Sequence, residues 1–194
     1  MYPFVIEFVA LVLFAGLLWH ASRYESRAFA QQWFVGGILS IFIRETIVQA
    51  LLQSNLYAPG FLRIGAAPVV MCLLTPSIIY LALHLARGFA HAESRARMLA
   101  LVFVITASIA LPLEATAAHA QWWTYATRTR AAFGAMPIIA PFAWGGAATI
   151  FYAVFAKVRA TRLPDRGKLY AMVTLAPLIA ATQLLWVLIL QVFG

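Results

Sequence analysis

The sequence predicts an all-α membrane protein: a polytopic bundle of about six transmembrane helices, with five to seven as the range, in one domain. Of its 194 residues, 64% are hydrophobic and 10% are charged, whereas a soluble domain is about 45–50% apolar and about 25% charged. The apolar residues lie in stretches close to the ~20 residues that a helix needs to cross a bilayer. The charged residues lie mostly between these stretches. These three observations exclude a soluble globular domain and a disordered chain.

Six apolar stretches follow one another along the chain. In order, they are Pro3–His20, Trp33–Gln53, Ala66–Leu85, Met98–His119, Met136–Ala156 and Leu169–Phe193. The first contains Glu7 and has no basic residue ahead of it, which is unlike a cleaved signal peptide. The connections are short, so we expect residues 1–194 to form a single domain without a soluble appendage.

Lys and Arg predict the orientation of the helices. Ten of them lie in the connections after the first, third and fifth stretches: Arg23, Arg27, Arg87, Arg95, Arg97, Lys157, Arg159, Arg162, Arg166 and Lys168. Three lie in the connections after the second and fourth: Arg63, Arg128 and Arg130. Under the positive-inside rule the odd connections are cytoplasmic and both termini face outward, in what we expect to be a bacterial plasma membrane. This topology explains the net charge of +8. We therefore expect membrane lipids as partners of the basic connections, and we expect no binding of nucleic acid.

The six acidic residues divide into two groups. Those that accompany basic residues in the predicted cytoplasmic connections are Glu25, Glu93 and Asp165. Glu7, Glu45 and Glu114 lie within apolar stretches, where an ionised carboxylate that faces lipid costs about 2.5–3.5 kcal/mol. At ~1.5 Å rise per residue, all three lie roughly 6–12 Å below the outer boundary. The sequence therefore predicts a group of buried carboxyl groups in the outer leaflet.

Aromatic residues gather at the same end of the predicted bundle. They are Tyr57, Trp122, Trp123 and Tyr125 in the two outer connections, and Trp144 and Trp186 in the outer halves of the last two stretches. An interfacial aromatic belt is one interpretation and remains open for Trp122 and Trp123. Trp144 lies deeper, behind Pro137 and Pro141, which indicates a bent helix that leaves room for a cavity. We expect these aromatic residues to line a substrate cavity.

Part of the chain is predicted to be an internal repeat. A shift of 69 positions aligns Gly65–Val70 with Gly134–Ile139 and places Glu45 on Glu114. The second and third stretches would then repeat as the fourth and fifth, in copies that cover roughly residues 33–87 and 98–158. Both copies run in the same direction, as expected for a parallel repeat about the membrane normal. Such symmetry predicts that Glu45 and Glu114 face each other across a shared cavity.

Several residue patterns that particular reactions require are absent from the sequence, which excludes those reactions. Cys72 is the only cysteine, which excludes a dithiol redox relay. No lysine lies inside a span to form a Schiff base, and no aspartate cluster is present to hold Mg²⁺ on a diphosphate. His20 and His84 are possible haem ligands but are more simply interfacial side chains. We therefore expect no metal and no cofactor.

The remaining groups are carboxyls, aromatic rings and one arginine within a span. A carboxyl group kept away from water can stay protonated and act as a general acid, while a second carboxylate takes the proton back. Aromatic faces stabilise a cation by about 2 kcal/mol or more when water is excluded. This combination is suited to reactions that pass through carbocations on an apolar isoprenoid.

We expect Arg44 to influence the protonation of these carboxyl groups. Its side chain leaves the helix about 100° away from that of the adjacent Glu45, so we expect it to pair with Glu114 or Glu7. If Arg44 ionises Glu114, Glu45 is the better proton donor, and the reverse assignment stays open. Glu7 is a third catalytic candidate, or a residue that snorkels to water from a helix end.

Two motifs of the second copy resemble known families. Ile109–Glu114 resembles the Pro-x-Glu helix motif of the small membrane lycopene cyclases, which are also built from acid-bearing hairpins. The run Trp122-Trp123-x-Tyr125 after Glu114, followed by Gly134-x-x-Pro137 and Trp144, is similar to the membrane carotenoid hydratases. The small transmembrane terpene cyclases of meroterpenoid and indole-terpenoid pathways are similar in using two intramembrane acids to protonate a prenyl chain.

The resemblance covers the second to fifth stretches and implies Glu45 and Glu114 as catalytic acids. Two departures limit it: Ala115 follows Glu114 where lycopene cyclases have paired acids, and the sixth stretch lacks the late acid of the terpene cyclases. The hypothesis is a metal-independent integral-membrane cyclase that protonates a lipophilic prenylated small molecule, with Glu45 as acid and Glu114 as partner or terminating base. A hydratase that uses the same acid and a proton-coupled transporter or carrier are the alternatives.

Overall fold

A computed structural model describes residues 3–52, 55–89, 94–125, 131–132 and 136–193. Its six α-helices are α1 (Pro3–Tyr24), α2 (Arg27–Ile47), α3 (Val69–Phe89), α4 (Arg95–His119), α5 (Ala140–Arg159) and α6 (Asp165–Phe193). A short π-helix, η1 (Val48–Leu52), continues α2. The strands are β1 (Asn55–Tyr57), β2 (Arg63–Ile64), β3 (Ala67–Pro68), β4 (Trp123–Tyr125), β5 (Ala131–Ala132) and β6 (Met136–Pro137). The prediction of an all-α bundle is confirmed, with three two-stranded ribbons added to it.

The helix ends differ from the predicted stretches for local reasons. α2 begins at Arg27 rather than Trp33, because the Ser26 hydroxyl caps its first turn by accepting a hydrogen bond from the Phe29 N–H. α3 and α5 begin later than predicted, since Ala67–Pro68 and Met136–Pro137 are extended strands. The residue before a proline is biased toward extended backbone, which delays the helix until the proline is passed.

Within the described residues, five helices are long and apolar enough to cross a membrane. Their candidate spans are Phe4–Tyr24, Arg27–Ala50, Val69–Phe89, Arg95–His119 and Asp165–Leu190. The other long helix, α5, is not among these candidate spans, although the sequence predicted one over Met136–Ala156. It packs against α4 and α6 as part of the same bundle. The protein is therefore a polytopic helical membrane protein.

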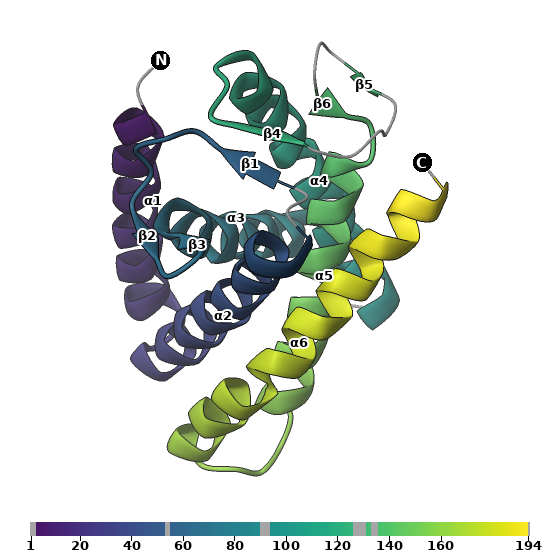
Figure 1. Cartoon of the computed structure of the whole chain (residues 1–194). Helices are drawn as coiled ribbons and strands as arrows, with labels where there is room; N and C mark the ends of the chain where they lie inside the picture. The colour runs from purple at the N-terminus through teal and green to yellow at the C-terminus, as the bar shows by residue number, and fades with distance from the viewer. Residues whose placement is uncertain (1–2, 53–54, 90–93, 126–130, 133–135, 194) are drawn as a thin grey trace.

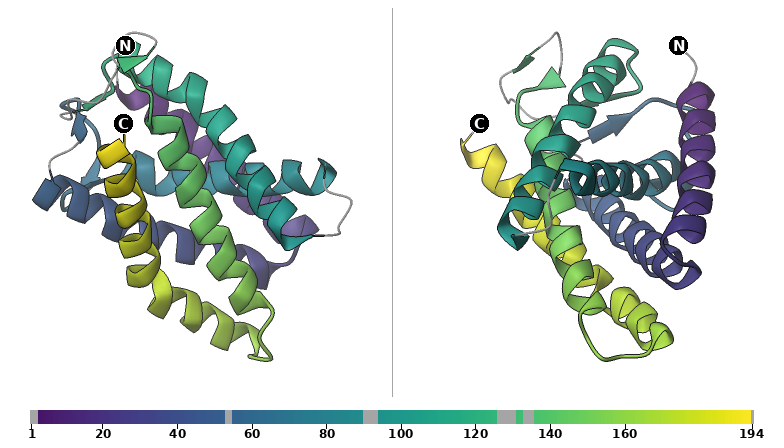
Figure 2. Two further views of the ribbon diagram at one scale, coloured as in Figure 1. Left: turned by 90° about the vertical axis from the view of Figure 1, so that its right-hand side faces the viewer. Right: turned by 180° about the vertical axis from the view of Figure 1, so that it is seen from behind.

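The helices form a bundle with α1 and α6 on opposite sides and the others between them (Figure 1). α2 packs against α3 and α6, while α1 packs mainly against α3. Both termini and the strands lie toward one end of the bundle, and the turns from α1 to α2 and from α5 to α6 lie toward the other (Figure 2, left). We call these the strand end and the turn end.

The buried core has two main parts. One contains stacked and edge-on rings toward the turn end, including Phe29, Trp33 and Phe151. The other contains Tyr57, Trp123 and Trp144 and lies toward the strand end. The aromatic residues of this second part surround the two buried glutamates described below.

The two predicted copies have the same order of elements. In each, a helix that carries a glutamate leads to a strand, then to a two-stranded ribbon, then to a returning helix. β1 of the first copy pairs with β4 of the second in antiparallel register, with Leu56 opposite Thr124. In the ribbons, Pro68 pairs with Arg63 and Pro137 with Ala131. The copies therefore meet along β1 and β4, which places their glutamate helices on the two sides of this contact.

Candidate functional site

Two buried carboxyl groups share one cavity at the strand end of the bundle. Glu45 from α2 and Glu114 from α4 are each 1% exposed. The cavity has a volume of about 90 Å³. The predicted site residues that line it are Glu45, Glu114, Arg44, Tyr57, Trp123, Tyr125 and Trp144. The geometric expectation that Glu45 and Glu114 face a shared cavity is thus met in the structure.

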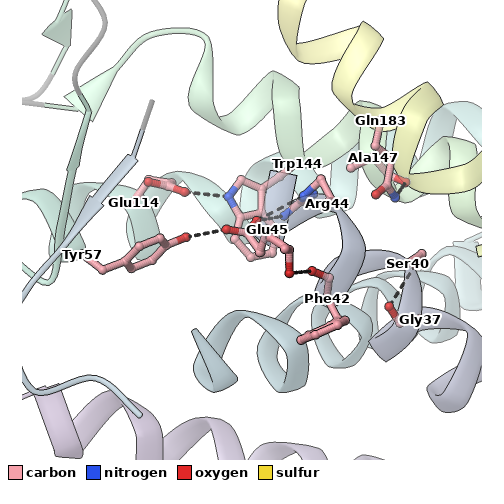
Figure 3. A network of polar contacts seen from close by, with 11 residues as sticks. Gly37, Ser40, Phe42, Arg44, Glu45, Tyr57, Glu114, Trp144, Ala147 and Gln183 are labelled. Carbon is pink, nitrogen blue, oxygen red and sulfur yellow. Dashed lines mark hydrogen bonds and ion pairs between the residues drawn. The ribbon is translucent and has the colours of Figure 1, made fainter. Parts of the chain in front are cut away.

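Glu45 is held by an arginine and a tyrosine. Arg44 donates to Glu45 Oε1 from Nη2 at 2.7 Å and from Nε at 3.1 Å. The Tyr57 hydroxyl donates to Glu45 Oε2 at 3.0 Å (Figure 3). Each carboxylate oxygen therefore has a partner, and the Arg44–Glu45 pair carries no net charge.

The sequence-based expectation that Arg44 pairs with Glu114 or Glu7 is wrong. Helix phase fixes the direction of the Cα–Cβ bonds but not the position of a guanidinium at the end of a long flexible side chain. The Arg44 side chain bends back onto the carboxylate of its immediate neighbour. An adjacent pair on one helix therefore forms a nearly buried ion pair, with side-chain exposures of 12% and 2%.

In the described part of the chain, the donors to Glu114 are all neutral. The Trp144 indole donates to Oε1 at 2.6 Å, and the Trp123 indole donates to Oε2 at 2.9 Å. The Tyr125 hydroxyl makes a third bond to Oε2 at 2.6 Å. An indole N–H can only donate, so both oxygens of Glu114 accept hydrogen bonds. Figure 3 shows Trp144 reaching Glu114 beside the Arg44–Glu45 pair.

The two tyrosines occupy corresponding places in the two copies. Tyr57 on β1 follows Glu45 by 12 positions, and Tyr125 on β4 follows Glu114 by 11. Each tyrosine hydrogen-bonds the glutamate of its own copy. A uniform shift of 69 positions places Tyr57 on Ala126 and misses this correspondence. Allowing a one-residue gap in the turn would have found it in the sequence.

Burial controls the protonation of these tyrosines. Loss of solvent raises the pKa of Tyr57 well above its ordinary value, and the nearby Glu45 carboxylate raises it further. Burial likewise raises the pKa of Tyr125, with Glu114 adding to the effect. Both phenols are therefore neutral at physiological pH and have a proton to donate.

Three predicted site residues lie outside the cavity. Glu7 accepts a hydrogen bond from the Leu62 backbone N–H at 2.6 Å and lines a separate groove. Trp186 donates to the Phe142 carbonyl at 3.1 Å and is partly exposed. Trp122 is buried behind Trp123, with ring centroids 6.5 Å apart.

Part of the cavity wall was not predicted from the sequence. Leu184 and Val187 on α6 and Met71 on α3 are among the apolar residues that line it. These residues resemble every other apolar position in their helices, so no pattern in the sequence marked them. Only the packing of α6 against α2 and α5 brings its side chains to the cavity.

The fold and the site together define a class: a polytopic helical membrane protein with two buried carboxyl groups in an aromatic-lined cavity. Among the described residues, no group of three or more His, Cys, Asp or Glu is placed to hold a metal ion. Searches with the chain against protein-family models, curated proteins and solved structures find no match. The function is therefore inferred from the geometry of the site.

Proposed function

We propose that this protein is an integral-membrane isoprenoid cyclase. It would protonate an alkene or epoxide of a lipophilic prenylated small molecule and close rings through carbocations, without a metal or cofactor. The observation that carries the proposal is the shared cavity, where Glu45 and Glu114 meet the rings of Tyr57, Trp123 and Trp144. An acid, a base and aromatic faces are the groups that such a reaction needs.

Charge balance supports Glu114 as the acid, the reverse of the assignment favoured by the sequence. Arg44 is the only basic residue among the described residues that line the cavity, and it is already paired with Glu45. An ionised Glu114 would leave one uncompensated negative charge in a medium of low dielectric constant, which is strongly unfavourable. With Glu114 protonated, the resting cavity is neutral.

The total charge of the cavity and the bound substrate also stays the same during the proposed reaction. The proton of Glu114 moves to the substrate, so that a carbocation and a Glu114 carboxylate form together. Trp123, Tyr125 and Trp144 are already placed to hydrogen-bond that carboxylate, and preorganised donors of this kind lower the barrier to charge separation. A carboxylate of the site then removes a proton from the ring-closed cation and ends the reaction.

The cavity limits what enters it. Its volume of about 90 Å³ is below the ~150 Å³ of an engineered cavity that holds benzene. It suits the reacting end of a prenyl chain, while the rest of the molecule would lie toward the bilayer. We place the basic odd connections in the cytoplasm and both termini outside, in a bacterial plasma membrane, on the basis of the charge distribution.

The test is expression of the protein beside prenylated precursors in heavy water, followed by mass analysis of the lipid extract. We expect an isomer of the precursor that carries one deuterium, and its loss in Glu114→Gln and Glu45→Gln. Glu25→Gln is the control, because Glu25 is exposed and lies at the turn end. Wild-type rates in both site variants would overturn the proposal.

Two other outcomes would replace the proposal by its alternatives. A product heavier by one water molecule would identify a hydratase that uses the same acid. Proton-driven uptake into proteoliposomes, with no new compound in the lipid extract, would identify a carrier.

A further inference from the structure

Two histidines from different helices lie side by side near the turn end, at the other end of the bundle from the cavity of Glu45 and Glu114. His20 is on α1 and His84 is on α3, each close to the last turn of its helix. Their ring centroids are 4.9 Å apart, and their ring planes are at 81° to each other. His84 is exposed and His20 is half-buried, so the pair can be reached from outside the protein.

Tyr80 on α3 fixes the position of the His20 ring. His20 Nδ1 and the Tyr80 hydroxyl share a hydrogen bond of 2.9 Å. Tyr80 is itself 1% exposed and packs edge-on against Phe29 and Trp33. A histidine that binds a metal usually gives its second ring nitrogen such a partner, which fixes the tautomer and the orientation of the ring. When Nδ1 of His20 donates to the Tyr80 oxygen, Nε2 keeps a free lone pair.

The separation of the two rings matches that of two ligands on one metal ion. A zinc–nitrogen bond of about 2.0–2.1 Å places the ion roughly 3.2 Å from the centre of an imidazole ring. Two imidazoles at a tetrahedral or right angle around the ion then have centroids roughly 4.5–5.2 Å apart. The 4.9 Å between His20 and His84 lies within this range. A haem iron binds two histidines on opposite sides, with centroids more than ~6 Å apart, so the pair does not have the spacing of haem ligands.

The surroundings of the pair are compatible with a bound cation. Arg87, which lies about one turn beyond His84 on α3, forms an ion pair with Glu25, so its charge is balanced. Among the described residues, no third His, Cys, Asp or Glu joins the two histidines. Water would therefore complete the coordination. Imidazole nitrogen suits zinc, copper and nickel, whereas magnesium and calcium prefer oxygen ligands.

We propose that His20 and His84 together bind one divalent transition-metal ion of the zinc type, with Tyr80 as the positioning residue for His20. The ion would tie α1 to α3, the helix against which α1 mainly packs. This site is structural: it takes no part in the proposed cyclisation, which stays metal-independent, and it does not depend on that function.

The test is a calorimetric titration of Zn²⁺ into the full chain, purified in detergent and freed of any histidine tag. We expect one Zn²⁺ per chain and no binding of Mg²⁺, which prefers oxygen ligands. Zn²⁺ should also raise the midpoint of thermal unfolding, because the two histidines come together only in the folded protein. The absence of saturable Zn²⁺ binding would overturn the proposal.

His84→Gln is the decisive variant, since His84 is exposed and its replacement should leave the midpoint of the metal-free protein unchanged. Both His84→Gln and His20→Gln should lose the bound Zn²⁺ and the rise in midpoint. Tyr80→Phe should still bind one ion per chain but about 10–100-fold more weakly, as is usual when the partner of a metal ligand is removed. His119→Gln, which replaces an exposed histidine at the strand end, is the matched control and should bind Zn²⁺ like the wild type. Unchanged binding in His84→Gln, or an equal loss in His119→Gln, would contradict the proposed site.

Discussion

The two hairpins of the repeat have the same architecture but treat their glutamates differently. In the first, Glu45 is bound by Arg44 and Tyr57. In the second, Glu114 is bound by two tryptophans and Tyr125. The position of Arg44 corresponds to Leu113 in the second copy, and the position of Trp144 corresponds to Thr75 in the first.

This difference shows how a symmetric scaffold can produce two chemically distinct acids. The backbone brings both carboxyl groups to one cavity, and the residue beside each decides its charge. In the proposed mechanism the Arg44–Glu45 ion pair is neutral, and Glu114, which has no cation beside it among the described residues that line the cavity, is neutral when protonated. A proton donor and a carboxylate can thus lie side by side, as acid–base catalysis requires.

The largest expected effect comes from giving the first copy the residue of the second. Arg44→Leu leaves Glu45 buried without its cation, which should lower the free energy of unfolding by about 3–5 kcal/mol. Denaturation in detergent micelles, followed by circular dichroism, measures this loss. The double variant Arg44→Leu with Glu45→Gln should recover most of it, because the unpaired charge is gone. A double variant as unstable as the single one would show that packing, not charge, is responsible.

A matched pair of tyrosine variants separates the two acids. Under the proposed assignment, in which Glu45 is the carboxylate and Glu114 is protonated at rest, Tyr57→Phe removes a hydrogen bond to a charged group and should cost about 1.5–3 kcal/mol of stability. Tyr125→Phe removes one to a neutral group and should cost about 0.5–1.5 kcal/mol. For turnover, Tyr125→Phe should have the larger effect of the two variants. It should lower the rate about 10²–10³-fold, because it removes a hydrogen-bond donor to the carboxylate that forms on Glu114. Equal effects of the two variants on both quantities would contradict the assignment of acid and base.

The close packing within each hairpin gives a smaller effect. A Cβ added at Gly37 would lie 2.7 Å from Pro76 Cβ, and one added at Gly145 would lie 2.9 Å from the Phe103 carbonyl oxygen. Gly37→Ala and Gly145→Ala should each lower stability by about 1–2 kcal/mol through overpacking. Gly16→Ala is the control, since nothing lies within 4 Å of its added Cβ. If Gly145→Ala unfolds like Gly16→Ala, the hairpin helices are less tightly packed than described.

The smallest expected change is in tyrosine ionisation. Because the pKa values of Tyr57 and Tyr125 are raised by burial, the folded protein keeps their protons above the usual pKa of about 10. The folded wild type and the Tyr57→Phe/Tyr125→Phe variant should therefore show equal phenolate absorbance near pH ~11. In denaturant at the same pH, the phenolate absorbance of the variant should be lower than that of the wild type by the contribution of two tyrosines. Since only the unfolded chain loses these protons, stability should also fall as pH rises above about 10.

Much of the fold was predictable because membrane helices are encoded locally. A run of apolar residues between clusters of arginine marks a helix without reference to the rest of the chain. The repeat was also readable, because Glu45, Glu114 and the two Gly-Ala-x-Pro segments keep the same spacing. The helix ends were less predictable, since β3 and β6 depend on prolines and on pairing with β2 and β5.

Composition and spacing are properties of the chain alone, and they were enough to predict a helical membrane protein with a repeated hairpin and buried carboxyl groups. Which of these groups meet depends on the packing of the helices and strands. That packing separated Glu7 from Glu45 and Glu114 and turned Arg44 onto its neighbour. It also brought tryptophans from two different elements onto Glu114. Side-chain partners depend on the packing of distant segments and on flexible torsions, which no local pattern encodes.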